Sequence, residues 1–222
     1  MARPTAPVNR PAARDPPLAA LFRWLFRATL ALVILGVLGF AFAWWLGSRS
    51  LPDYDGGRRV EGIGAPVEIV RDHSNVPHIF GRTDADVFFG LGYAHAQDRL
   101  WQMIVLRRTA QGRLSEVFGE RTLAMDRLVR RLDLYGLATR SVEAQDDATR
   151  AALEAYAAGV NAWLREVNAK ALGRGAPEMW LFPQAVSPWQ PADSLALLKL
   201  MALQLNGHLE ADFPGVPASC FC

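Results

Sequence analysis

The feature that most limits the folds open to this chain is a run of 21 residues without a charged side chain, between Arg27 and Arg49. In helical form, a run of this length crosses a hydrocarbon core of about 30 Å. A helix that is apolar on every side needs lipid or a large protein core around it, and no neighbouring segment supplies such a core. We therefore predict that residues 28–48 cross a membrane as one helix.

This helix is either an uncleaved anchor or a cleaved signal peptide, because Ala41-Phe42-Ala43 has the pattern of a signal-peptidase site. The anchor is favoured, since the apolar run continues past this triplet through Leu46. A modest excess of arginine before the run favours a cytoplasmic N-terminus, and an Ala- and Arg-rich composition indicates a bacterial source. We predict a bacterial inner-membrane protein whose body faces the periplasm.

The segments beside the apolar run lack the patterns of folded structure. Residues 1–27 form a basic N-terminus that we expect to be disordered. Residues 49–64 contain Pro52 and a Gly-Gly pair, and we expect a linker before a body that begins near Ala65. A net charge of +2 gives no reason to expect binding to nucleic acid. Both cysteines lie within the last three residues, so the body has no cysteine framework or Cys-based metal site.

The predicted centre of the body is a helix that extends from Asp84 to about Gln111. Thr83 and Asp86 have the spacing of a capping box, which marks a helix start. Apolar residues then recur at helical spacing over a broad surface, as expected for a buried helix. Its middle also holds polar residues, which predicts a hydrogen-bonded network. His95 and Asp98 are one helical turn apart and could form one of its bonds.

The other segments predict a mainly α fold with one short β-hairpin, preceded by the transmembrane helix. The hairpin is expected over residues 66–80. Further helices are expected over 122–139, from Asp146 or Asp147 to about 171, and from Pro191 to about 206. The apolar face of the last helix is predicted to be Leu195, Leu198, Met201, Ala202 and Leu205. Histidines outside the central helix have no further ligands at metal-binding spacing.

Four separated stretches carry a resemblance to a known family. They read VEIVRDHSNVPHIFG, GYAHAQDRLWQM followed by RRTAQGRLSEVFG, LEAYAAGVNAWL, and PWQPADSLALLKLM. In this order they resemble the penicillin acylase (penicillin amidase) family of N-terminal-nucleophile hydrolases. The resemblance is to the family's α chain and defines an α-chain-like region over residues 65–212. Residues 213–222 look like an unrelated tail, as a frameshift or an early stop would leave.

The resemblance implies an amidohydrolase that cleaves the carbon–nitrogen bond of N-acyl substrates such as β-lactams, within a four-layer αββα fold. The family cuts a precursor into two chains, and the β chain begins with the catalytic Ser. The α-amino group of that Ser titrates at about 7.7–8.0 and serves as the base. We expect this chain to be the α-chain portion, partnered by a Ser-headed β chain of the same precursor or a separate chain. We name no catalytic residue, because the Ser-headed chain is absent from this sequence.

Two groups of site residues follow from the resemblance. The last helix of the α chain lines the acyl pocket, which corresponds here to Ala202, Leu205 and Asn206. An acidic residue beyond that helix binds a structural Ca²⁺, and Glu210 or Asp212 is the candidate. The exposed flank of the central helix is the expected docking surface for the β chain. The alternative is an inactive remnant that acts only as a membrane-anchored binding or scaffold piece.

Overall fold

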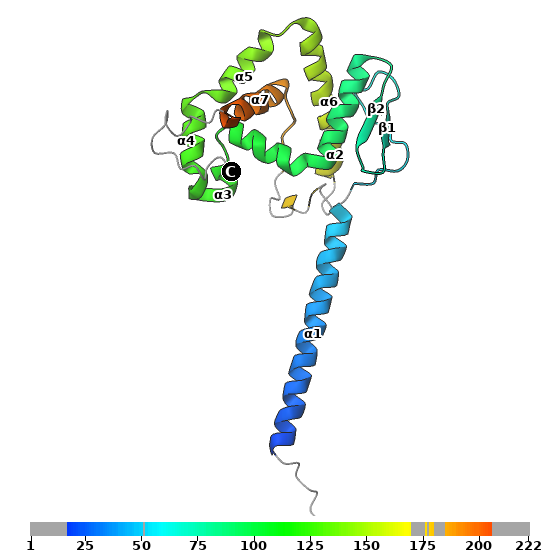
Figure 1. The fold of residues 1–222 in the computed structure, drawn as a ribbon, viewed down its shortest axis with the longest axis vertical. Helices are drawn as coiled ribbons and strands as arrows, with labels where there is room; N and C mark the ends of the chain where they lie inside the picture. The colour runs from blue at the N-terminus through cyan, green and yellow to red at the C-terminus, as the bar shows by residue number, and fades with distance from the viewer. Residues whose placement is uncertain (1–16, 51, 170–175, 177, 180–184, 206–222) are drawn as a thin grey trace, which may run out of the picture. The chain divides into compact units, whose positions relative to one another are not determined.

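The computed structural model describes residues 17–50, 52–169, 176, 178–179 and 185–205. It separates into two units, residues 1–46 and 47–222, and each is described by itself. The first unit consists of α1 (Pro17–Ser50), a single helix of 34 residues that extends beyond it into the second (Figure 1). Residues 20–48 of α1 are long and apolar enough to cross a membrane, with a mean hydropathy of 2.2. A signal sequence satisfies the same criterion, so both interpretations of this segment stay open.

The central helix of the body is α2 (Asp84–Ala110), and its predicted cap is confirmed. Thr83 Oγ1 accepts from the Asp86 backbone N–H at 3.2 Å, while the Asp86 carboxylate accepts from the Thr83 N–H at 3.1 Å. The Asp86 carboxylate also accepts from the Thr83 hydroxyl at 2.8 Å, and this bond is the main cause that lowers the pKa of Asp86 below its usual range. The sequence did not indicate the kink at Arg99, where φ is −134° and ψ is 23°.

The second long helix, α6 (Asp147–Ala169), crosses α2 at very close range. Its cap is Asp146, whose carboxylate accepts from the Thr149 N–H at 2.7 Å. A Cβ atom on Gly159 would overlap the backbone of α2, so the two helices pack backbone against backbone at that glycine. The crossing encloses the larger of two core clusters of the described residues, to which α2 and α6 contribute the buried side chains Phe89, Leu100, Val160, Trp163, Leu164 and Val167.

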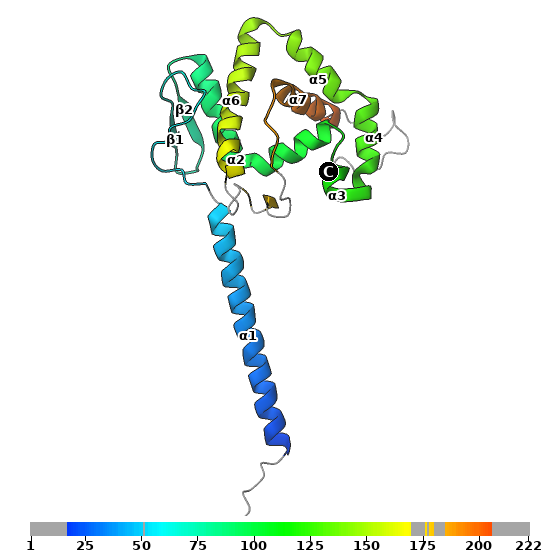
Figure 2. The same cartoon turned by 180° about the vertical axis from the view of Figure 1, so that it is seen from behind.

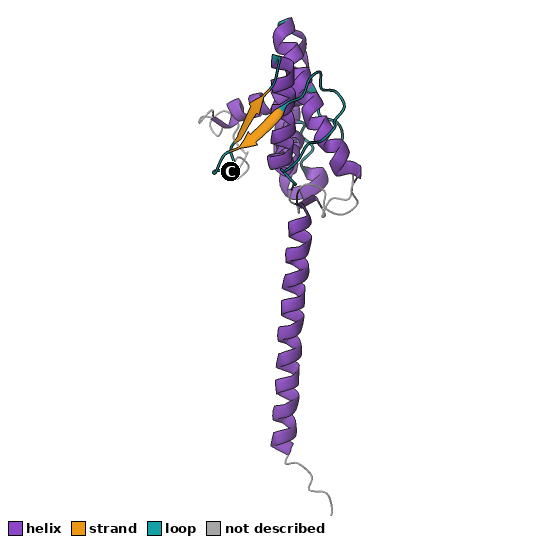
Figure 3. Ribbon diagram, turned by 90° about the vertical axis from the view of Figure 1, so that its right-hand side faces the viewer, coloured by secondary structure: helices purple, strands orange, loops and turns teal. Residues whose placement is uncertain are grey.

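The predicted hairpin is confirmed as β1 (Glu68–Arg71) paired antiparallel with β2 (Pro77–Phe80). It lies beside α2 as the one sheet among otherwise helical elements of the described body (Figure 3). The contact is at Gly90, where a Cβ atom would come within 2.8 Å of Val67 and 2.7 Å of Ile79. Residues 52–64 contain neither helix nor strand, and they contact the body through Tyr54 and Arg58.

The prediction of one helix over 122–139 is wrong. The segment that follows α3 (Ser115–Phe118) forms a 3-10 turn, η1 (Gly119–Thr122), then α4 (Leu123–Arg131) and α5 (Leu134–Glu143). The break is at Asp133, whose φ of 49° is left-handed. Asp tolerates this conformation better than most residues, so the apolar periodicity continues across a change of direction. The two helices build a second core cluster with Leu200.

The last helix, α7 (Pro191–Leu205), packs against α5, α2 and α6 (Figures 1 and 2). Its predicted apolar face is wrong apart from the partly buried Leu195, because the helix buries Ala192, Asp193, Ala196 and Leu200. The helix is apolar on most of its circumference, so the periodicity of the sequence could not identify the buried side. The small Ala side chains on that side allow α5 to approach closely. The expected exposed flank of α2 is also wrong. Among the described residues of α2, Phe88 is the single large hydrophobic side chain that is exposed, because α6 and the hairpin cover the rest.

Candidate functional site

The exposed apolar surface of α7 is the first candidate for a functional site. We define the α7 face as Leu198, Met201, Ala202 and Leu205, which share one side of the helix. The three large residues are 64%, 57% and 79% exposed. Ala202 and Leu205 are two of the three predicted pocket residues, and the third, Asn206, lies outside the described residues, as do Glu210 and Asp212. Ala202 and Leu205 therefore lie on an exposed apolar surface of α7.

A buried carboxylate holds the start of α7 in place. Asp193 is 1% exposed and accepts from the Gln190 backbone N–H at 2.8 Å. It also accepts from the Tyr135 hydroxyl of α5 at 3.0 Å and from the Gln111 amide beyond α2 at 3.3 Å. Arg107 supplies the counter-charge at 3.6 Å. One side chain thus ties α7 to two other helical segments, which orients the α7 face.

Arg107 and Asn161 fix the segment that leads into α7. Arg107 is 5% exposed and donates to the carbonyl oxygens of Ser187 and Pro188 at 3.0 and 3.3 Å. Burial lowers its pKa, and the neighbouring Asp193 acts in the opposite direction. Asn161 of α6 accepts from the Trp189 N–H at 2.6 Å and donates to the Trp189 carbonyl at 2.9 Å. Nothing in the sequence pairs these residues with this segment, because Arg107 and Asn161 lie 80 and 28 positions from their partners Ser187 and Trp189.

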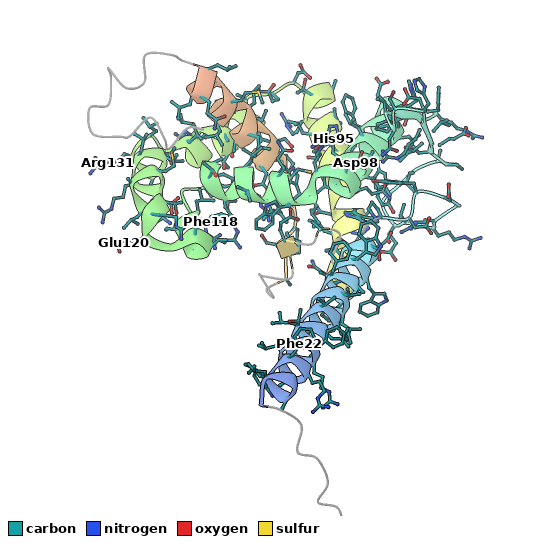
Figure 4. All side chains as sticks on the ribbon, turned by 60° about the horizontal axis from the view of Figure 1, so that its bottom comes forward. Phe22, His95, Asp98, Phe118, Glu120 and Arg131 are labelled. Carbon is teal, nitrogen blue, oxygen red and sulfur yellow. The ribbon has the colours of Figure 1, made fainter. Side chains whose placement is uncertain are left out.

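A second polar group lies on the exposed side of α2, where Figure 4 labels His95 and Asp98. The structure does not pair them: His95 Nδ1 lies 3.0 Å from the Tyr156 hydroxyl. Asp98 instead accepts two bonds from Arg71, at 2.9 and 3.0 Å, and one from Tyr54 at 3.0 Å. The hydrogen bond suggested between His95 and Asp98 is therefore wrong, because each side chain has a partner from another element.

The ionisation of this group argues against nucleophilic chemistry at Tyr156. Burial raises the pKa of Tyr156 to about 12, so its phenol stays protonated near neutral pH. Burial also lowers the pKa of His95, although the residue has solvent access. A neutral imidazole can therefore accept the phenol proton at Nδ1. Both side chains serve as one hydrogen-bonded contact between α2 and α6.

A cavity of about 640 Å³ lies under residues 53–66, against β1 and α2. Its wall includes Tyr93, whose hydroxyl donates to Glu166 at 3.0 Å. Arg58 pairs with the same carboxylate at 2.6 Å. Burial raises the pKa of Tyr93 to about 12, with Glu166 as the second cause. Among the described residues, no group of three or more His, Cys, Asp or Glu side chains could hold a metal ion.

Comparison with known proteins places these elements in a family. The family model for penicillin amidase matches residues 66–218. The chain is 38% identical over 160 residues to penicillin acylase 2 proenzyme of Pseudomonas sp. (strain SE83), covering 71% of this chain and 20% of that protein. It is 34% identical over 197 residues to the acyl-homoserine lactone acylase QuiP of Pseudomonas aeruginosa, covering 87% and 23%.

The fold is also similar to that of a solved structure, a thermostable penicillin G acylase from Alcaligenes faecalis. The two share 31% sequence identity with a TM-score of 0.56, over 63% of this chain and 74% of that chain. The chain spans about a fifth of the length of the curated relatives that it matches. Because the family model matches residues 66–218, this chain belongs to the penicillin amidase family.

Proposed function

We propose that this chain is the α-chain portion of an amidohydrolase that hydrolyses the amide bond of N-acyl substrates such as acylated β-lactams. The family match over residues 66–218 carries the proposal. In this reaction the catalytic Ser heads a second chain, and its free α-amino group takes the hydroxyl proton. The present chain then contributes substrate binding and not the nucleophile.

The α7 face supports this division of roles. An acyl group needs an apolar surface, and the α7 face exposes three large apolar side chains on a helix that is fixed by Asp193. Burying one such side chain against a substrate or a second chain is favourable by about 1.5–3 kcal/mol. We propose that Ala202, Leu205 and Asn206 line the acyl side of the pocket once the Ser-headed chain is in place.

We also propose that Glu210 or Asp212 supplies one carboxylate to a structural Ca²⁺. Calcium takes six to eight oxygen ligands, so the second chain would supply most of them. We further propose that α1 anchors the enzyme in the bacterial inner membrane, with the body in the periplasm. Removal of divalent metal with a chelator is then expected to lower the thermal midpoint of the assembled enzyme, and added Ca²⁺ should restore it.

The test is to co-express the full chain with the polypeptide that follows the matched region in the Pseudomonas sp. relative. We expect hydrolysis of a phenylacetyl amide that releases a coloured amine. Leu205→Asp, which puts a charge on the α7 face, should reduce kcat/KM about tenfold or more, because an apolar contact to the acyl group is lost. The exposed variant Glu120→Gln lies outside the α7 face and is the control. A stable two-chain complex without any hydrolysis would refute the proposal.

A further inference from the structure

We infer that the outer edge of β1 binds an added β-strand from the polypeptide that completes the enzyme. This inference rests on the proposed function, and it names the surface through which the second chain joins this one.

The register of the hairpin identifies which backbone groups point away from it. Opposed residues in an antiparallel pair alternate between hydrogen-bonded and non-bonded pairs. The Asp72 N–H donates to the Val76 carbonyl at 3.2 Å, just beyond the paired residues Arg71 and Pro77. The pairs that exchange hydrogen bonds are therefore those of Val70 and Glu68. It follows that Ile69 and Arg71 direct their backbone N–H and C=O groups away from β2.

The two edges of the hairpin differ in their capacity to accept a strand. On β2 the outward positions are Pro77 and Ile79, and Pro77 has no N–H to donate. Proline on an edge strand blocks the pairing of another strand there. On β1 both outward residues, Ile69 and Arg71, keep their donors. No backbone hydrogen bond from another described segment reaches either of these two residues. The open edge is thus β1.

The hairpin has apolar side chains on both faces, although the outward face also carries Glu68 and His78. The inner face places Val67 and Ile79 against α2 at Gly90. The opposite face exposes Val70 and Phe80, at 45% and 58%. Exposed Val70 and Phe80 are apolar surface that a neighbouring strand and its side chains would cover.

The cavity beside β1 has the space and the polar group that an added strand requires. Its wall includes Val67, Ile69 and Arg71 of the inner face, and its volume of about 640 Å³ accommodates several side chains. Gln97 of α2 also lines it. This side chain is 7% exposed, and its amide can donate to or accept from an incoming backbone.

Amide exchange measured residue by residue tests this inference. In the full chain alone, the Ile69 and Arg71 amides should exchange fast, whereas those of Glu68 and Val70 should be protected within the hairpin. In the complex with the rest of the polypeptide from the Pseudomonas sp. relative, exchange at Ile69 and Arg71 should slow by about tenfold or more. Ile69→Pro removes the outward donor and should abolish the complex. Ile69→Ala, which loses the side chain but keeps the donor, should retain it.

The outcomes separate this inference from the proposed function. A complex that hydrolyses substrate while Ile69 and Arg71 still exchange fast overturns the inference and leaves the function standing. A complex that protects both amides but does not hydrolyse substrate supports the inference and contradicts the function. The absence of any complex contradicts both. Protection of the Glu68 and Val70 amides in the Ile69→Pro chain verifies that the variant keeps its hairpin. Loss of the complex is then due to the blocked outer edge of β1.

Discussion

Gly159 of α6 lies directly against the carbonyl oxygen of Phe89 in α2, with no space for a side chain between the two helices. The crossing therefore brings two backbones together, and Gly92 makes the reciprocal approach to Tyr156. Helices at this separation exclude even a methyl group, so the two glycines set both the distance and the position of the crossing. The rest of the body is built around this contact.

Gly159→Ala should destabilise the body by about 2 kcal/mol, because the added methyl group must displace the α2 backbone. The change is unfavourable despite the better helix propensity of Ala, which would stabilise by about 1 kcal/mol in an unhindered helix. Chemical denaturation measures this loss in the free energy of unfolding. Gly57→Ala is the matched control, since a Cβ atom there meets nothing within 4 Å. Equal unfolding midpoints for the two variants would show that the crossing is looser than we describe.

Asp193→Asn should lower the free energy of unfolding by about 3–5 kcal/mol, because it leaves Arg107 buried without its counter-charge. The amide also presents a donor where the carboxylate accepts from Gln190 and Tyr135. Glu120→Gln, on an exposed turn, should change stability by less than about 0.5 kcal/mol. If Asp193→Asn unfolds at the same denaturant concentration as the parent chain, the proposed role of Asp193 in holding α7 is wrong.

Truncation of two leucines of α7 should change the stability of the chain by very different amounts. Leu200 is 1% exposed in the second core cluster, and Leu200→Ala should cost about 2–5 kcal/mol of stability. Leu205 is 79% exposed, so Leu205→Ala should leave the stability of the isolated chain within about 0.5 kcal/mol. Thermal or chemical denaturation distinguishes them. A large loss for Leu205→Ala alone would mean that the α7 face is covered in the free chain.

The body should lose stability as the pH falls below about 6.5, the unperturbed pKa of histidine. Burial lowers the pKa of His95 in the folded chain, with Asp98 acting against it, so the unfolded chain binds the proton first. Stability is then fully present above pH 6.5 and declines as the pH falls toward the lower pKa of the folded state. His95→Gln should remove this part of the decline. The carboxyl groups of Asp86 and Glu116, whose pKa values are lowered, act at lower pH.

An unfolding curve at each pH from 7.5 to about 3.5 checks this prediction. Glu116 owes its lowered pKa first to its hydrogen bonds from Arg113, so Glu116→Gln should alter the decline below about pH 4.5 and not the histidine range. Identical profiles for the parent chain and His95→Gln between pH 7 and 5 would exclude His95 as the responsible group.

Some of the site was predictable from local chemistry. The capping box at Thr83 and the hairpin over residues 66–80 depend on groups within a few residues of each other, so their patterns are visible in the sequence. Asp193 accepts a bond of the same local kind from the Gln190 N–H. Its bonds to Tyr135 and Gln111 could not be foreseen, because they join residues 58 and 82 positions apart in the chain.

The sequence by itself determined the apolar helix, the order of the helical segments in the body and the family to which it is similar, because each depends on composition or on spacing along the chain. Tertiary structure decided which side of α7 is buried and where the 122–139 segment turns. It also paired His95 with Tyr156 and not with Asp98. A helix such as α7 is apolar on most sides, so only the neighbour that packs against it, here α5, selects the face that leaves water.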